Sequence, residues 1–174
     1  SATIFPGAAK LPQEELREGD IQRLIAAFAA AAARCRTAGF DGVQIHAAHG
    51  YLVSQFLSPL TNRPTDRLGG DPERRRAFLR VVILAVRTAC GADYPILVKQ
   101  NVGDWHPDGM EINAAVEVCR MLDDLGAAAI ELSGGIAETI PAAFRKAELM
   151  AAGEAVFFED ACRAVHARVS CPLI

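Results

Sequence analysis

Two histidines and a tyrosine lie within six residues of the sequence, where a predicted strand ends. His46, His49 and Tyr51 form the segment H-A-A-H-G-Y directly after the run G-V-Q-I. Histidines three positions apart can direct two N–H donors at one point if the chain turns tightly, and Gly50 permits such a turn. Two converging donors suit one oxygen atom, and the weakly acidic Tyr51 hydroxyl can protonate a neighbouring atom. The segment predicts a site that binds a carbonyl oxygen and protonates the carbon skeleton beside it.

The same segment has two other interpretations. An isolated H-x-x-H motif is weak, and such histidines are more often satisfied polar residues near a core, with Tyr51 at the end of the strand. A zinc site would need further cysteine, histidine or carboxylate ligands, and the segment has no obvious ones nearby. We therefore expect no metal here, and the neighbouring elements must decide between catalysis and packing.

Several segments have the apolar spacing of amphipathic helices. The first begins at Asp20, and its alanine-rich run continues to Arg36 before Gly39 stops it. Asp71 and Pro72 supply an N-cap and a first-turn proline for the second. The predicted helices are 20–36, 71–90, 113–125 with Asn113 as N-cap, and 159–169.

Short apolar runs between these helices predict buried strands. The runs are 41–46, 95–100 and 127–132, and residues 171–174 could begin a fourth strand. Strands that alternate with helices form βα units and hence a parallel sheet with right-handed crossovers. This order excludes all-β and helix-bundle folds.

Polar residues at the strand ends favour one kind of parallel sheet. His46, Lys99 and Ser133 lie at the carboxyl ends of three successive predicted strands. In a (β/α)₈ barrel every strand end opens into one shared mouth, whereas an open doubly wound sheet binds its ligand at one switch point. A complete barrel takes about 250 residues, so we predict that residues 1–174 form a single partial barrel.

Composition limits the kinds of binding partner that we expect. The formal net charge of −3 provides no basic field for nucleic acid or an anionic membrane surface, so we expect a small-molecule substrate. Five widely spaced cysteines without a C-x-x-C pair indicate reduced thiols and a cytoplasmic protein. The longest apolar stretch, 24–33, is too short to span a membrane.

An extended block of sequence resembles the old yellow enzyme family of NADH:flavin oxidoreductases. It comprises residues 38–52, 55–59, Asn62, 65–66, 69–70, Arg75, 98–99, 108–109 and 131–135. The resemblance implies a (β/α)₈ barrel with FMN at its carboxyl-end mouth. The matched segments would be the fourth to sixth βα units, and the start of the seventh strand would follow.

The resemblance also implies residue roles. The positions matching His46 and His49 bind the carbonyl oxygen of an α,β-unsaturated substrate, and the position matching Tyr51 supplies the proton. The position matching Lys99 is basic and lies against the pyrimidine edge of the flavin, where a positive charge favours the anionic reduced ring. A surface lysine whose charge reaches solvent is the alternative for Lys99.

Three residues depart from the family pattern. Pro64 stands where arginine is common, Leu68 where an aromatic is common, and Arg74 where asparagine is usual. We expect these changes to alter loop packing and oligomer contacts more than the chemistry. The loop and the helix after it are rich in arginine, which forms either a patch for an anionic substrate tail or a solvated charged surface: Arg63, Arg67, Arg74 and Arg76.

These observations predict an FMN-dependent oxidoreductase that uses NADH or NADPH to reduce the C=C bond of an enone or enoate. An alternative is a catalytically inactive structural or assembly fragment of a larger flavoprotein, and a third interpretation is another phosphate- or metal-dependent barrel enzyme. A partial barrel exposes strand edges and one flank of its core, so we also expect a homo-oligomer.

Overall fold

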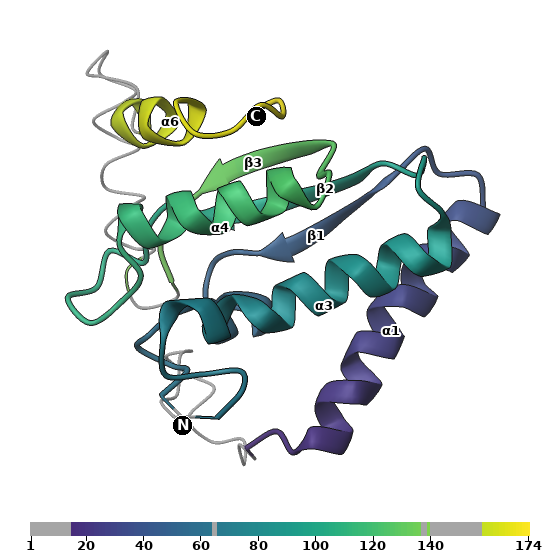
Figure 1. The fold of residues 1–174 in the computed structure, drawn as a ribbon, viewed down its shortest axis with the longest axis horizontal. Helices are drawn as coiled ribbons and strands as arrows, with labels where there is room; N and C mark the ends of the chain where they lie inside the picture. Colours follow the sequence, from purple (N-terminus) through teal and green to yellow (C-terminus); the bar gives the residue numbers. More distant parts are fainter. Residues whose placement is uncertain (1–14, 64–65, 137–138, 140–157) are drawn as a thin grey trace.

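A computed structural model describes residues 15–63, 66–136, 139 and 158–174 of the chain (Figure 1). Helices and strands alternate along it, as the sequence predicts, and their ends differ by no more than a few residues from the predicted ones. The elements are α1 (Glu18–Thr37), β1 (Val43–Ala47), α2 (Leu52–Leu57), α3 (Pro72–Cys90), β2 (Ile96–Asn101), α4 (Ile112–Asp124), β3 (Ala129–Ser133) and α6 (Glu159–His166).

The strands form one parallel sheet in the order β1-β2-β3. Ile130 of β3 also forms a parallel bridge with Leu173. The backbone N–H groups of Ile130 and Leu132 donate to the carbonyls of Pro172 and Ile174, at 2.9 Å each. The predicted start of a further strand at 171–174 is therefore confirmed as the next parallel neighbour of β3.

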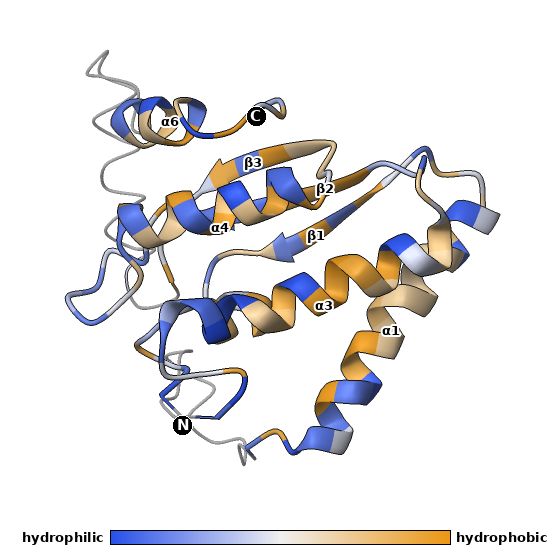
Figure 2. Cartoon of the chain, viewed as in Figure 1, coloured by the Kyte–Doolittle hydropathy of each residue, from blue (hydrophilic) through white to orange (hydrophobic). Residues whose placement is uncertain are grey.

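Helices α3 and α4 cover one face of this sheet (Figure 1). Alternate strand residues point to opposite faces, and Ile45, Val98 and Ile130 on the covered face are each at most 5% exposed. Phe78 and Leu122 of the helices are fully buried against them, and hydrophobic and hydrophilic residues alternate along both helices (Figure 2). Burying side chains of this size stabilises the fold by about 1.5–3 kcal/mol each.

The start of α4 differs from the prediction. The N-cap is Glu111, in an extended conformation, and Asn113 lies in the first turn of the helix. Asp104 accounts for the shift, because its carboxylate accepts the Met110 N–H at 2.8 Å and fixes the chain just before Glu111. Asn113 as N-cap was therefore wrong by two residues.

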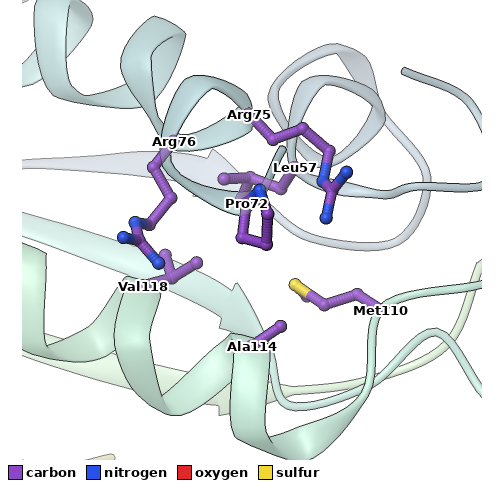
Figure 3. A pocket seen from close by; sticks show the side chains of 7 residues that line it. All are labelled: Leu57, Pro72, Arg75, Arg76, Met110, Ala114 and Val118. Atoms are coloured by element: carbon purple, nitrogen blue, oxygen red, sulfur yellow. The ribbon is translucent and has the colours of Figure 1, made fainter. Parts of the chain in front are cut away.

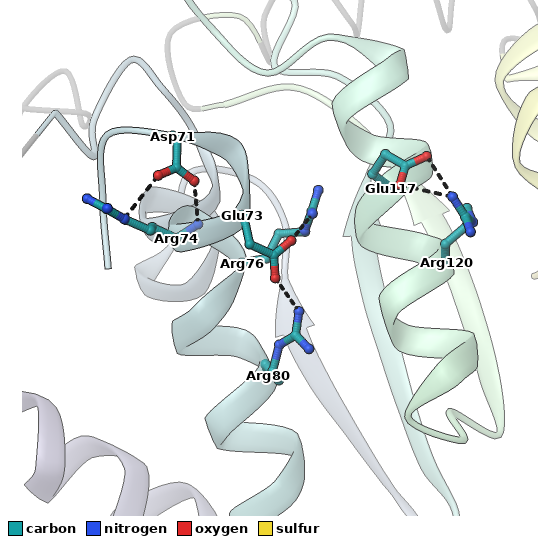
Figure 4. Close-up of polar contacts among 7 residues, drawn as sticks. All are labelled: Asp71, Glu73, Arg74, Arg76, Arg80, Glu117 and Arg120. Carbon is teal, nitrogen blue, oxygen red and sulfur yellow. Dashed lines mark hydrogen bonds and ion pairs between the residues drawn. The ribbon is translucent and has the colours of Figure 1, made fainter. Parts of the chain in front are cut away.

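The loop of residues 58–70 accommodates its departures from the family pattern locally. Leu68 is 5% exposed and joins the core, and the Asn62 side-chain amide donates to the Phe56 and Leu68 carbonyls. Arg74 forms an ion pair with Asp71 at 3.0 Å (Figure 4). Pro64 lies outside the described residues.

The arginines of this region do not converge on one point. Arg63 donates to the Leu60 carbonyl at 2.9 Å, and each of the others has a carboxylate partner of its own. These ion pairs are Arg67–Glu18, Arg74–Asp71 and Arg76–Glu73, the last two of which are drawn in Figure 4. The pairing favours a charged surface over a patch for an anionic substrate tail, and the Arg76 side chain is only 15% exposed.

Among the described residues, none of the helices combines the length and apolarity needed to cross a bilayer.

The edge of β1 generates a prediction about assembly. In the described part of the chain β1 pairs with β2 alone, so its other edge can accept a further strand. We expect purified protein to associate with itself increasingly as its concentration rises, and sedimentation velocity over a dilution series measures this. A compact monomer across the whole series would contradict the expectation.

Candidate functional site

The face of the sheet opposite to α3 and α4 carries a row of polar side chains. In the parallel register His46 of β1 lies beside Lys99 of β2, and Lys99 lies beside Glu131 of β3. Because paired residues in neighbouring strands share a face, all three project from the same side of the sheet. They are partly exposed, whereas the residues next to them in sequence pack against the helices. We call this side of the sheet the polar face, and it forms one side of the candidate site.

A tight turn follows β1 and reverses the chain. His49 and Gly50 both have left-handed backbone conformations, with φ of 63° and 75°. Few side chains tolerate this region, so glycine suits the second position, whereas His49 requires support. That support comes from Asn101, whose side-chain oxygen accepts the His49 N–H at 3.2 Å. The turn predicted at Gly50 is present and begins one residue earlier.

A short helix that the sequence analysis did not identify completes the turn. Tyr51 is the N-cap residue of α2 rather than the end of a strand. The Ser54 hydroxyl accepts the Gly50 N–H at 3.2 Å, and the Gln55 amide donates to the Gly50 carbonyl at 2.8 Å. Only six residues long, α2 is too short for its apolar spacing to be recognised.

The turn brings the predicted rings together. The ring centroids of His46 and His49 are 5.1 Å apart with planes at 68°. Those of His46 and Tyr51 are also 5.1 Å apart, with planes at 49°. Both imidazoles are partly exposed and Tyr51 is 49% exposed, so the cluster faces outward and is not part of the core. The geometry therefore favours the site interpretation over the packing one.

Two strand-end residues contact this cluster from β2 and β3. Ser133 Oγ lies 2.6 Å from His49 Nε2; its hydroxyl can donate or accept, depending on the imidazole tautomer. Asn101 is fully buried, and its amide donates to the Gly135 carbonyl at 2.8 Å and to Asp104 at 3.3 Å. Asn101 thus connects the ends of all three strands. The sequence analysis missed its role, because a polar residue after a strand is also ordinary loop material.

Lys99 has a partner that the sequence analysis did not consider. Its ammonium lies 2.5 Å from Glu131 Oε1, and the Gln44 amide donates to Glu131 Oε2 at 2.8 Å. The Lys99 side chain is 26% exposed, which differs from a lysine extended into solvent. Strand alternation could have identified Glu131, because it lies two residues before Ser133 and on the same face.

Electrostatics leave the two histidines neutral at pH 7. Burial is the main cause that lowers the pKa of His46, and the Lys99 charge lowers it further, whereas Glu131 raises it. Burial is also the main cause that lowers the pKa of His49. His46 and Lys99 lower this pKa further, whereas Glu131 raises it. The hydrogen bond from Lys99 lowers the pKa of Glu131. A neutral imidazole has one N–H donor, and that of His49 is available to a ligand in the tautomer in which Ser133 donates to Nε2.

The structure also has a hollow away from this cluster. A shallow hollow on the helix-packed side is lined mainly by apolar side chains and two arginines. Its residues are Leu57, Pro72, Arg75, Arg76, Met110, Ala114 and Val118 (Figure 3). Within the described ranges there is no group of three or more histidine, cysteine or acidic residues placed to hold a metal ion.

Comparison with known proteins identifies the family. The model of the NADH:flavin oxidoreductase / NADH oxidase family matches residues 2–157. The chain belongs to this family. A solved family structure, the old yellow enzyme homologue from Zymomonas mobilis, has a TM-score of 0.72 at 25% identity and covers 99% of this chain and 48% of that one. Old yellow enzymes are (β/α)₈ barrels, so the partial barrel is confirmed and the open doubly wound sheet is ruled out.

Two curated relatives extend the comparison. A metal reductase of Desulforamulus reducens is 50% identical over 126 residues, which cover 72% of this chain and 19% of that protein. An NADPH dehydrogenase of Geobacillus thermodenitrificans is 41% identical over 135 residues, which cover 78% of this chain and 39% of that protein. The chain thus spans less than half the length of these relatives.

The lowered histidine pKa values predict a pH dependence of stability. Because folding favours the neutral imidazoles, the free energy of unfolding should fall as the pH drops below about 6.5, the ordinary histidine pKa. Urea unfolding between pH 7.5 and 5 measures this, and an NMR titration of His46 and His49 against a histidine peptide assigns it. Imidazoles that titrate at or above the peptide value would contradict the electrostatic description.

Asn101 provides a second prediction. Asn101→Ala should lower the free energy of unfolding by about 1–3 kcal/mol, because buried groups that it bonds, including the His49 N–H and the Gly135 carbonyl, lose their partner. Urea denaturation measures the loss. The control is Asn113→Ala at an exposed first-turn position of α4, where we expect a change within about 0.5 kcal/mol. Equal losses in the two variants would contradict both the role of Asn101 and the position of the α4 N-cap.

Proposed function

We propose that this chain carries the substrate-binding and proton-donating part of an FMN-dependent NAD(P)H oxidoreductase, which reduces the C=C bond of an enone or enoate. The convergence of the His46, His49 and Tyr51 rings at the mouth of the partial barrel carries the proposal. Membership of the NADH:flavin oxidoreductase family supports the redox chemistry. The five free thiols support a reducing, cytoplasmic setting.

The histidines bind the substrate oxygen in this proposal. Each neutral imidazole donates one N–H to the carbonyl oxygen of the substrate, on which negative charge develops as the C=C bond is reduced. Well-placed donors of this kind contribute on the order of 3 kcal/mol each to the transition state. Neutral histidines suit the task, because they bind the oxygen without transferring a proton to it prematurely.

Tyr51 completes the reduction. When bound, FMN reduced by NADH or NADPH supplies the hydride that is added to the β-carbon. The Tyr51 O–H gives a proton to the α-carbon, the enolate electrons form the new C–H bond, and solvent reprotonates the phenolate. Hydride and proton together make the saturated carbonyl product. The exposure of Tyr51, 49%, is consistent with proton exchange with water.

The donor set of the polar face fits a flavin. A flavin ring presents a flat surface and an edge of carbonyl and nitrogen acceptors. The polar face offers the Lys99 ammonium and the Gln44 amide as donors, each with N–H groups beyond the one it gives to Glu131. Lys99 would contact the flavin edge, as the family resemblance implies. Its ion pair with Glu131 means that this charge is already shared before a ligand binds.

The edge of β1 that has no strand partner among the described residues favours one second candidate. Because such an edge can accept a further strand, the chain is in this alternative an inactive structural or assembly fragment of a larger flavoprotein. Flavin binding distinguishes the two functions. A yellow protein with the absorption of bound FMN supports the enzyme, whereas a colourless protein that gains activity only with complementary segments supports the fragment.

Replacing the proton donor tests the mechanism. In flavin-loaded protein, Tyr51→Phe should slow enone turnover by about 10²–10⁴-fold, because general acid catalysis contributes factors of this size. Stopped-flow absorbance should show that reduction of the flavin by NADH or NADPH keeps its rate, since that step does not use the phenol. Tyr94→Phe, at a 6% exposed position between α3 and β2, is the matched control. Unchanged enone turnover in Tyr51→Phe would remove the assignment.

A further inference from the structure

Glu131 lies at the end of a row of ionisable side chains that crosses the sheet. His46, Lys99 and Glu131 are in register on three neighbouring strands, which lie about 4.8 Å apart. The cation is therefore in the middle of the row, with an imidazole on one side and a carboxylate on the other. The Lys99 charge lowers the pKa of His46, and the Glu131 charge raises it.

Both oxygens of Glu131 are engaged. Oε1 accepts from Lys99 at 2.5 Å and Oε2 accepts from Gln44 at 2.8 Å. Gln44 belongs to β1 and Lys99 to β2, so this carboxylate connects all three strands across the polar face. These two hydrogen bonds orient the carboxylate toward Lys99, whose backbone lies in register with His46.

We propose that Glu131 is a positioning residue that holds the Lys99 ammonium and offsets its field at His46 and His49. The part of this inference that concerns flavin rests on the proposed function. The charged groups that act on both imidazoles are Lys99 from β2 and Glu131 from β3, and His46 acts in addition on His49. Tyr51 lies beside His46, and Ser133 contacts His49. Without the carboxylate, the lysine charge would act on the histidines unopposed.

An NMR titration of the free protein tests the inference without any cofactor. Glu131→Gln keeps the size of the side chain and removes its charge, so the pKa of His46 and of His49 should fall, because Glu131 raises both. Lys99→Met should raise both values, since Lys99 lowers them. The double variant should return toward the wild-type titration. Lys99→Met also keeps the test decisive if Glu131→Gln does not fold.

A matched control removes a similar ion pair elsewhere. Glu117 pairs with Arg120 on the exposed side of α4 (Figure 4), and Glu117→Gln should leave both imidazole titrations unchanged. If Glu131→Gln behaves like Glu117→Gln, or if both histidine pKa values rise, the inference is overturned and Glu131 merely ties the strands together.

Flavin binding supplies the second readout. In FMN-loaded protein, Glu131→Gln should bind reduced flavin more tightly relative to oxidised flavin, and its midpoint potential should become more positive, because a negative charge near the ring is lost. Lys99→Met should shift the potential in the opposite direction. A potential that Glu131→Gln leaves unchanged in flavin-loaded protein would overturn this part. If no variant and no wild-type protein binds FMN, the proposed function fails, whereas the imidazole titrations still decide the role of Glu131.

Discussion

The parallel register of the three strands is the constraint on which the site depends. Because side chains alternate along each strand, one face of the sheet is sealed by α3 and α4 and the other is left for polar groups. A one-residue slip of β2 against β1 would exchange these faces, burying Lys99 among apolar side chains and exposing Val98. The buried face therefore fixes the position of every polar group opposite to it. Apolar packing against α3 and α4 thus determines where the polar side chains on the opposite face lie.

The turn after β1 brings the rings of His49 and Tyr51 close to that of His46. His46 lies on the strand, whereas His49 and Tyr51 come from the turn and α2, and they approach His46 only because the backbone reverses at His49 and Gly50. A left-handed histidine costs free energy, and the buried Asn101 side chain offsets that cost by accepting its N–H. The ring cluster is thus supported by a residue from a strand more than fifty positions away in the sequence.

On the polar face the positive charge of Lys99 is balanced by the negative charge of Glu131. Partial burial keeps the imidazoles neutral, and Lys99 reinforces this effect, but the ammonium itself is paired with Glu131. The chain belongs to a family of NADH:flavin oxidoreductases, and in the proposed function negative charge develops on the reduced ring and on the substrate oxygen. The neutral imidazole donors and the Lys99–Glu131 ion pair suit such charges. They can stabilise negative charge on either group, although the polar face itself carries little net charge.

Much of the fold could be predicted from the sequence, and the errors have local causes. Apolar periodicity identified α1, α3, α4 and the strands, because each is long enough or bounded clearly enough to show its pattern. It missed α2, which has fewer than two turns, and it chose Asn113 as N-cap because nothing local shows that Asp104 fixes the chain before Glu111.

The sequence by itself determined which chemical groups are present and that they follow strand ends: two imidazoles, a phenol and a lysine. These are properties of residue type and short-range spacing, which require no knowledge of the rest of the chain. Only the tertiary structure decided that Lys99 and Gln44 both bond to Glu131 across the strands, and that Asn101 and Ser133 reach the His49 turn. Those contacts join residues 52 to 87 positions apart for His49–Asn101, His49–Ser133 and Gln44–Glu131. They exist because strand pairing brings distant segments side by side, which no local pattern encodes.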